Sequence, residues 1–141
     1  MVPPVLAWSA RLLLSIALYS GTGAVWYSPS VAGNVFLAAA YPDLHKSGKP
    51  VPPADPRAYA ASVGGAAVAM PLFVFLLHVV GAIRGGVAPA VGWAVGVGLF
   101  SAGLAAPHGW FEGRDPRLAW VHAGYHMAGL LVVAVTLAVL P

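Results

Sequence analysis

The sequence predicts an all-α membrane protein with a bundle of four transmembrane helices. Only 8% of the residues are charged and 60% are hydrophobic, and the mean hydropathy is +0.82, whereas about a quarter of the residues in a soluble domain are charged. Four apolar segments of about 20 residues, the length that crosses a bilayer, fill most of the 141 residues. We therefore expect a single four-helix transmembrane domain over residues 1–141, without a separate soluble domain.

The four apolar segments are separated by polar, proline-rich or glycine-rich stretches. We expect the spans at about residues 5–25, 58–80, 88–106 and 117–140, with a long loop at 30–57. Arg11 lies near the start of the first span, where its side chain can reach the lipid headgroups. A secretory signal peptide is the alternative for this segment, but no small-residue cleavage site follows its apolar core directly.

The first span ends in two amphipathic aromatic residues, Trp26 and Tyr27, which suit a membrane interface and precede the long loop. Residues 31–40 are apolar but too short to span, so we expect one interfacial helix there. Residues 41–57 are rich in proline and charge and predict an exposed, semi-extended loop. This loop is either a lid over a site or disordered.

Prolines and glycines shape the two middle spans. Pro71 lies near the middle of the second span and predicts a kink. Gly92 and Gly96 have the spacing that lets two helices approach closely, either within the bundle or in a homo-oligomer. Pro107 is expected to end the third span, and Pro116 to open the fourth.

The distribution of positive charge predicts the orientation in the membrane. The loops at 30–57 and 107–117 carry most of the Lys and Arg residues, namely Lys46, Lys49, Arg57, Arg114 and Arg117, whereas the face of the termini carries Arg11 and Arg84. By the positive-inside rule these loops are cytoplasmic and both termini are outside. We expect the protein in a bacterial plasma membrane.

A functional site is predicted where a polar loop runs into the fourth span. His122, Tyr125, His126 and Gly129 follow i, i+3, i+4, i+7 spacing, so they share one helix face. Polar side chains inside a membrane span are costly and are therefore functional candidates. His78, in contrast, lies near the opposite interface, and we expect a separate structural role for it.

Charged and aromatic residues are predicted at the same membrane depth as this helix face. Glu112 and Arg114 precede the fourth span, and His108 lies close enough in sequence to reach the same place. The aromatic residues at this loop face are Trp26, Tyr27, Tyr59, Trp110 and Trp120. We expect His126, Tyr125, Glu112 and Arg114 to carry any chemistry, and Trp26, Tyr27, His122, His108, Trp110 and Trp120 to contribute to binding.

Three classes of function fit these residues. In an enzyme, His122 or His126 would act as general acid or base with Glu112, while Arg114 or Tyr125 would stabilise negative charge. In a carrier or channel, the same face would bind a lipid, an isoprenoid or a small solute. In a structural subunit of a membrane complex, Glu112 would pair with Arg114 or Arg117, and the histidines would bond helix carbonyls.

No cofactor is favoured by the sequence. His108, His122 and His126, perhaps with Glu112, are an alternative metal set, and His126 is the best axial ligand for an alternative haem. Two histidines on one helix face are common, so this spacing is a weak signal. The absence of cysteine excludes disulfide and thiolate chemistry, and a net charge of +3 gives little support to nucleic-acid binding.

Three motifs resemble those of an integral-membrane family catalogued as domain of unknown function 1761. They are Trp26-Tyr27-Ser28-Pro29 after the first span, Glu112-Gly113-Arg114 after the third, and Ala123-Gly124-Tyr125-His126 in the fourth. The resemblance covers the whole chain and implies a small four-helix membrane protein without implying an activity. Members usually carry Asn where this chain has His122, which favours Tyr125 and His126, with Glu112 and Arg114, as the shared site. We expect the ligand to be an apolar or amphipathic small molecule.

Overall fold

The fold was analysed in a computed structural model that describes residues 4–48 and 56–140, without the side chains of residues 4–6, 58 and 108–110. The described residues form six α-helices, four long and two short, and no strand. They are α1 (Pro4–Trp26), α2 (Gly33–Ala40), α3 (Pro42–Ser47), α4 (Pro56–Val79), α5 (Val87–Phe111) and α6 (Pro116–Val139). The predicted all-helical fold is therefore confirmed, although the number of helices is six instead of four.

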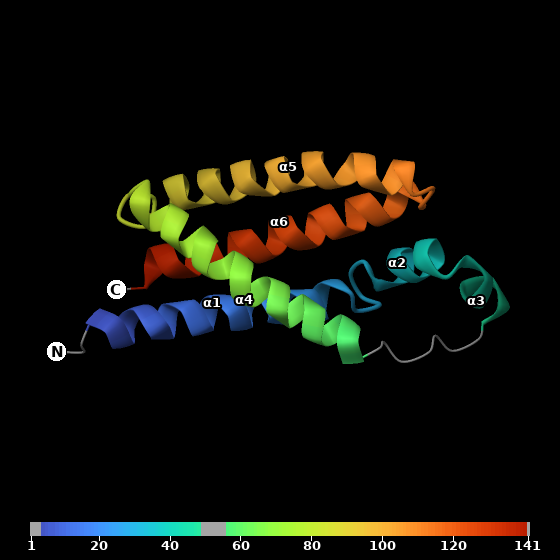
Figure 1. The fold of residues 1–141 in the computed structure, drawn as a ribbon, viewed down its shortest axis with the longest axis horizontal. Helices are drawn as coiled ribbons and strands as arrows, with labels where there is room; N and C mark the ends of the chain where they lie inside the picture. The colour runs from blue at the N-terminus through green and yellow to red at the C-terminus, as the bar shows by residue number, and fades with distance from the viewer. Residues whose placement is uncertain (1–3, 49–55, 141) are drawn as a thin grey trace.

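The four long helices form an elongated bundle (Figure 1). Helices α5 and α6 run side by side, α1 packs against α6, and α4 crosses α1 obliquely. The beginning of α1, the end of α6 and the turn between α4 and α5 lie at one end, whereas α2 and α3 lie at the other. We call this second end the loop end.

Three of the described helices, α4, α5 and α6, are long and apolar enough to cross a membrane. Their outer faces carry large apolar side chains that water would not favour. Val68 and Phe75 on α4 are 66% and 62% exposed, and Phe100 on α5 is 68% exposed. Hydrocarbon is a favourable surrounding for such faces, so the surface agrees with the composition in indicating a membrane protein.

The core lies where α4 and α6 meet the other long helices. Its largest fully buried apolar side chains are Met70, Val74 and Leu77 from α4 and Val133 and Leu137 from α6. The spacings are four and three residues on α4 and four residues on α6, so one stripe of each helix is buried. The core thus holds the bundle together nearer the end with the termini.

Two segments are more helical than the sequence indicated. Pro107 does not end the third span, because α5 continues through it to Phe111. A proline removes one backbone hydrogen bond and crowds the carbonyl four residues before it, yet one further turn forms here. Residues 42–47 form α3, which ends at Gly48 in the left-handed conformation that favours glycine (φ 64°). The remaining part of the expected proline-rich loop, residues 49–55, lies outside the described residues.

The glycines at which helices approach closely are not those indicated by spacing. A Cβ added to Gly92 or Gly96 would have no heavy atom within 4 Å, so the expectation that they pack inside the bundle is wrong for the described residues. Dimerisation through them stays a prediction. On α6, by contrast, a Cβ on Gly129 would lie 2.6 Å from Cδ2 of Tyr19. Gly129 therefore permits the close approach of α1 and α6.

We expect Gly129→Ala to lower the free energy of unfolding by about 1–3 kcal/mol, because the Tyr19 ring would have to move away from α6. Thermal or denaturant unfolding in detergent measures this change. The matched control is Gly103→Ala on α5, where an added Cβ meets no atom within 4 Å. Alanine favours helix more than glycine does, so the control should be neutral or slightly stabilising. Equal effects of the two substitutions would contradict the close approach.

Candidate functional site

The contact between α1 and α6 begins at Trp26, the last residue of α1. Its indole Nε1 donates a hydrogen bond of 3.0 Å to the backbone oxygen of Val121. The ring lies directly over Gly124, where any Cβ would collide with it. Trp26 and Gly124, which belong to two of the three sequence motifs, therefore form one structural contact.

A tyrosine–histidine pair lies further inside the bundle. The Tyr19 hydroxyl and the His126 Nδ1 atom share a hydrogen bond between α1 and α6. The Tyr125 ring packs against both, with its centroid 5.1 Å from that of Tyr19 and 5.0 Å from that of His126. Its hydroxyl also donates a long hydrogen bond, 3.4 Å, to the backbone oxygen of Tyr19. Tyr125 is buried and supports the pair from the side.

A second tyrosine–histidine pair lies one helical turn closer to the loop end. The Tyr27 hydroxyl is 2.6 Å from the His122 Nδ1 atom. Burial, with a smaller contribution from Tyr125, raises the pKa of Tyr27 to about 12, so its hydroxyl is protonated at neutral pH and can donate this bond. Phe36 of α2 packs edge-on against Tyr27 and His122, with centroid distances of 5.2 and 6.0 Å. Helix α2 thus covers the second pair.

The face predicted on the fourth span is turned toward α1. Tyr125 and Gly129 are buried, His126 is half-buried, and His122 is the most exposed of the four. Because the two histidines are four residues apart on α6, His126 lies opposite Tyr19 of α1 and His122 lies opposite Tyr27, the residue after α1. Tyr19 was not identified from the sequence. The sequence signal that could have identified Tyr19 is its polar hydroxyl inside an apolar segment.

The charged residues before α6 pair with one another. Arg114 Nε lies 2.6 Å from Glu112 Oε2, and both side chains are more than half exposed. Asp115 caps α6 by accepting a 2.8 Å hydrogen bond from the Arg117 backbone N–H. The hydrogen bonds from Arg117 lower the pKa of Asp115. Neither Glu112 nor Arg114 bonds to a histidine among the described residues, so their catalytic role stays a prediction.

The other predicted site residues lie outside this cluster or outside the described side chains. Trp120 is 78% exposed on the outer surface of α6. The side chains of His108 and Trp110 are not described. His78 lies on α4 and packs edge-on against Trp8, with ring centroids 4.9 Å apart, and takes no part in the two pairs, as expected.

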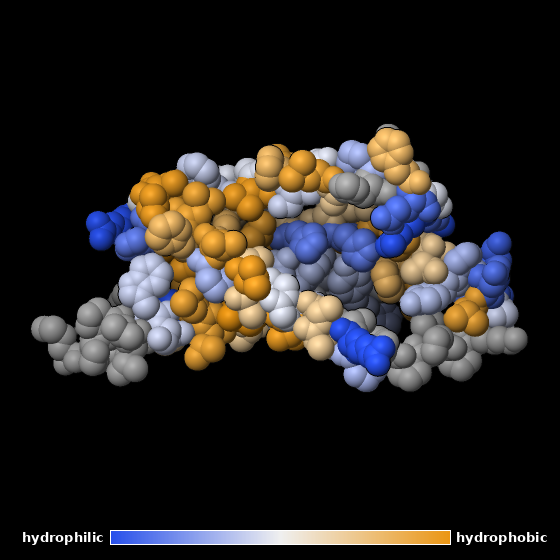
Figure 2. Space-filling view, in the orientation of Figure 1, coloured by the Kyte–Doolittle hydropathy of each residue, from blue (hydrophilic) through white to orange (hydrophobic). Residues whose placement is uncertain are grey.

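A cavity of about 450 Å³ lies beside the Tyr19–His126 pair, between all four long helices. Figure 2 shows the surface hollowed between α4 and the α5–α6 pair, with hydrophilic and hydrophobic side chains in and around the hollow. The cavity walls are mostly apolar, and the lining residues are Tyr19, Ala69, Met70, Leu72, Phe73, Leu76, Val97, Ser101, His126 and Leu130. Ser101, like Tyr19, was missed in the sequence, because a single serine in an apolar helix is a weak signal.

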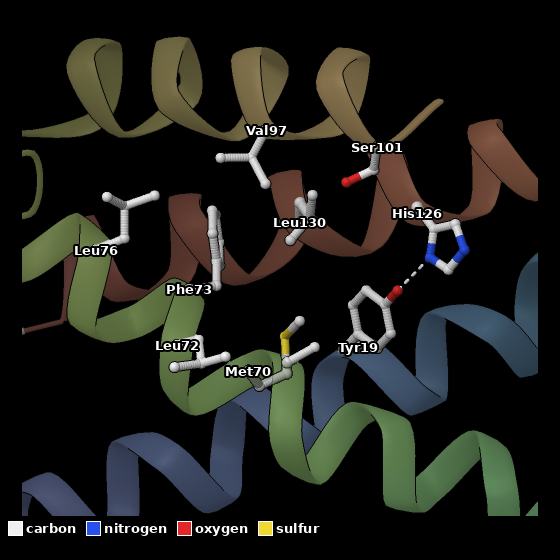
Figure 3. A pocket seen from close by; sticks show the side chains of 10 residues that line it. Tyr19, Met70, Leu72, Phe73, Leu76, Val97, Ser101, His126 and Leu130 are labelled. Atoms are coloured by element: carbon white, nitrogen blue, oxygen red, sulfur yellow. Dashed lines mark hydrogen bonds between the residues drawn. The ribbon is translucent and has the colours of Figure 1, made fainter. Parts of the chain in front are cut away.

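The polar groups of the cavity gather at one of its ends. In Figure 3, Tyr19, His126 and Ser101 lie together, whereas Phe73, Leu72 and Leu76 lie toward the other end. The three polar side chains can donate and accept hydrogen bonds, and imidazole can also exchange a proton. Among the described side chains, no three His, Asp or Glu residues lie close enough together to hold a metal ion.

We expect Trp26→Phe to lower the free energy of unfolding by about 1 kcal/mol, because the substitution removes the hydrogen bond to Val121 but keeps an aromatic ring. Unfolding in detergent is again the measurement. Trp120→Phe is the matched control, since its exposed side chain should contribute little. A Trp26→Phe variant as stable as this control would mean that the indole bond does not hold α1 to α6.

Comparison with known proteins places the chain in a family. A family model described as "Protein of unknown function (DUF1761)" matches residues 11–138, which include both tyrosine–histidine pairs and the cavity. No curated protein and no solved structure matches the chain. Because the model covers most of its length, the chain belongs to the DUF1761 family, in agreement with the three motifs in its sequence.

Proposed function

We propose that this protein crosses the membrane with its four long helices and binds a hydrophobic small molecule in the cavity between them. Helices α4, α5 and α6 have the length and composition of membrane spans. Helix α1, with 23 residues, is long enough to be the fourth. Four crossings would place both termini on one side and the 30–57 and 107–117 loops on the other, which the excess of Lys and Arg suggests is the cytoplasmic side.

The observation that carries the binding proposal is the cavity itself. Its volume, about 450 Å³, falls within the usual range of small-molecule sites, roughly 300–1,000 Å³. Such sites combine mostly apolar walls with a few polar groups that orient the ligand. Here the walls come from α4, α5 and α6, and the orienting groups are Tyr19, Ser101 and His126.

The position of the polar end along α6 suggests a ligand that arrives through the lipid. His126 is ten residues beyond the first residue of α6, which corresponds to about 15 Å at 1.5 Å per residue. This distance is about half the hydrocarbon thickness of a bilayer. A ligand that reaches this depth between helices must itself be soluble in hydrocarbon over most of its surface.

Acid–base chemistry on the bound molecule is the second candidate function. It is favoured by one observation, that the titratable Tyr19–His126 pair forms part of the cavity wall. In that case His126 would be the catalytic acid or base, and Tyr19 would position its ring through the Nδ1 bond. Glu112 and Arg114 would then shape the loop end instead of acting on the ligand.

Filling the cavity tests the binding proposal. Ala69 lines the cavity from α4, so Ala69→Trp would occupy it without removing a polar group. Ala67→Trp, also exposed on α4 but absent from the lining, is the matched control. The protein is purified in detergent, and its organic extract is examined by mass spectrometry.

We expect the wild type and the Ala67→Trp variant to contain a small molecule that is enriched over a detergent blank. The amount of this molecule should fall at least about tenfold in Ala69→Trp, because most of the apolar contact area would be lost. Thermal unfolding establishes that all three proteins are folded. Equal amounts in the folded variants, or no enriched molecule in any of them, would contradict binding in this cavity.

A further inference from the structure

We infer that the molecule bound in the cavity has an uncharged, oxygen-bearing head, such as a hydroxyl or carbonyl group, and not a carboxylate, phosphate or amine. This inference rests on the proposed binding function and specifies the chemistry of its ligand. Three features of the cavity, as the described residues form it, lead to it. No lining side chain among them carries a permanent charge, the Ser101 hydroxyl bonds to none of them, and the polar and apolar lining residues lie at different ends (Figure 3).

Among the residues that the structure describes, the lining contains no Asp, Glu, Lys or Arg. The described charges that form ion pairs lie instead at the loop end, where Glu112 pairs with Arg114 and Asp115 with Arg117. Within the described residues, the contacts of His126 are with Tyr19 and Tyr125 and not with a carboxylate. A charged head would therefore be buried in a site without a permanently charged partner, beside a histidine whose Nδ1 is already bonded to Tyr19, which is strongly unfavourable.

The Ser101 hydroxyl, unlike two hydroxyls of α1, is not used by a hydrogen bond within its own helix. Ser15 donates to the Arg11 oxygen at 2.7 Å and Thr22 to the Leu18 oxygen at 2.8 Å, each within its own helix. Among the described residues, the Ser101 hydroxyl makes no such bond, and it points into the space between the helices (Figure 3). A hydroxyl or carbonyl oxygen of a ligand would be a matching partner.

The rest of the cavity suits an apolar tail or ring. Leu72, Phe73 and Leu76 extend along α4 away from Ser101 and His126 (Figure 3). A molecule with a single polar end would satisfy Ser101 at that end and bury its hydrocarbon against these side chains. The cavity is therefore matched to a neutral long-chain alcohol, an ester or a quinone-like carbonyl compound.

Three probes of equal chain length test this inference: 1-hexadecanol, hexadecanoate and hexadecylamine. Each is added at the same mole fraction in the detergent micelles to the full-length protein, and the occupancy of one molecule per chain is measured by native mass spectrometry. We expect hexadecanol to bind at least about tenfold more tightly than either charged probe. Ala69→Trp should abolish this binding, which locates it in the cavity.

Ser101→Ala should weaken hexadecanol binding about fivefold through loss of one hydrogen bond. Ser62→Ala, on the exposed part of α4, should leave it unchanged. A charged probe that binds the wild type as tightly as hexadecanol, and no longer binds the Ala69→Trp variant, would overturn the inference about the head. The proposed function would then stand. If no probe binds to the wild type, the proposed function fails and this inference fails with it.

Discussion

The structure depends on one constraint, that polar side chains between long apolar helices must find partners within the protein. Helix α6 carries two histidines, and α1 with the residue after it supplies a tyrosine for each. The two hydrogen bonds determine the rotation of α1 about its axis, because a different rotation would leave His122 and His126 unpartnered. Without a hydrophobic force between helices in lipid, such bonds and close packing are what specify which helices meet.

Close packing of α1 and α6 explains where the cavity lies. Gly124 and Gly129 allow the rings of Trp26 and Tyr19 to lie against the α6 backbone. Helix α4 packs against α1 and crosses it obliquely, whereas α5 lies along α6, so α4 and α5 diverge from the turn that joins them (Figure 1). The space that remains is the cavity, and the Tyr19–His126 bond forms part of its wall. One contact thus both stabilises the fold and provides the polar end of the candidate site.

The sequence predicts the surroundings of the site better than it predicts which residues make up the site. The membrane environment follows from hydropathy, and His126 was identified because a polar group in an apolar segment is costly. Tyr19 and Ser101 obey the same rule, but an isolated tyrosine or serine in a span is common, and only the three-dimensional contact with His126 and the cavity distinguishes them. Likewise, Gly92 has the spacing of a glycine at a helix–helix contact, but a Cβ added to it would have no atom within 4 Å. Spacing alone does not reveal which face of a helix meets a partner.

The central claim is that a neutral amphipathic molecule occupies the space between α4, α5 and α6, with its head at the Tyr19–His126 pair. Photo-crosslinking tests it most directly: the protein in lipid nanodiscs is labelled with an alkyl alcohol that carries a diazirine near its hydroxyl, and the modified peptides are mapped by mass spectrometry. Our account predicts labelling concentrated at Tyr19, Ser101 and His126. Labelling spread over lipid-facing positions such as Phe75 and Phe100, in proportion to their exposure, would contradict it.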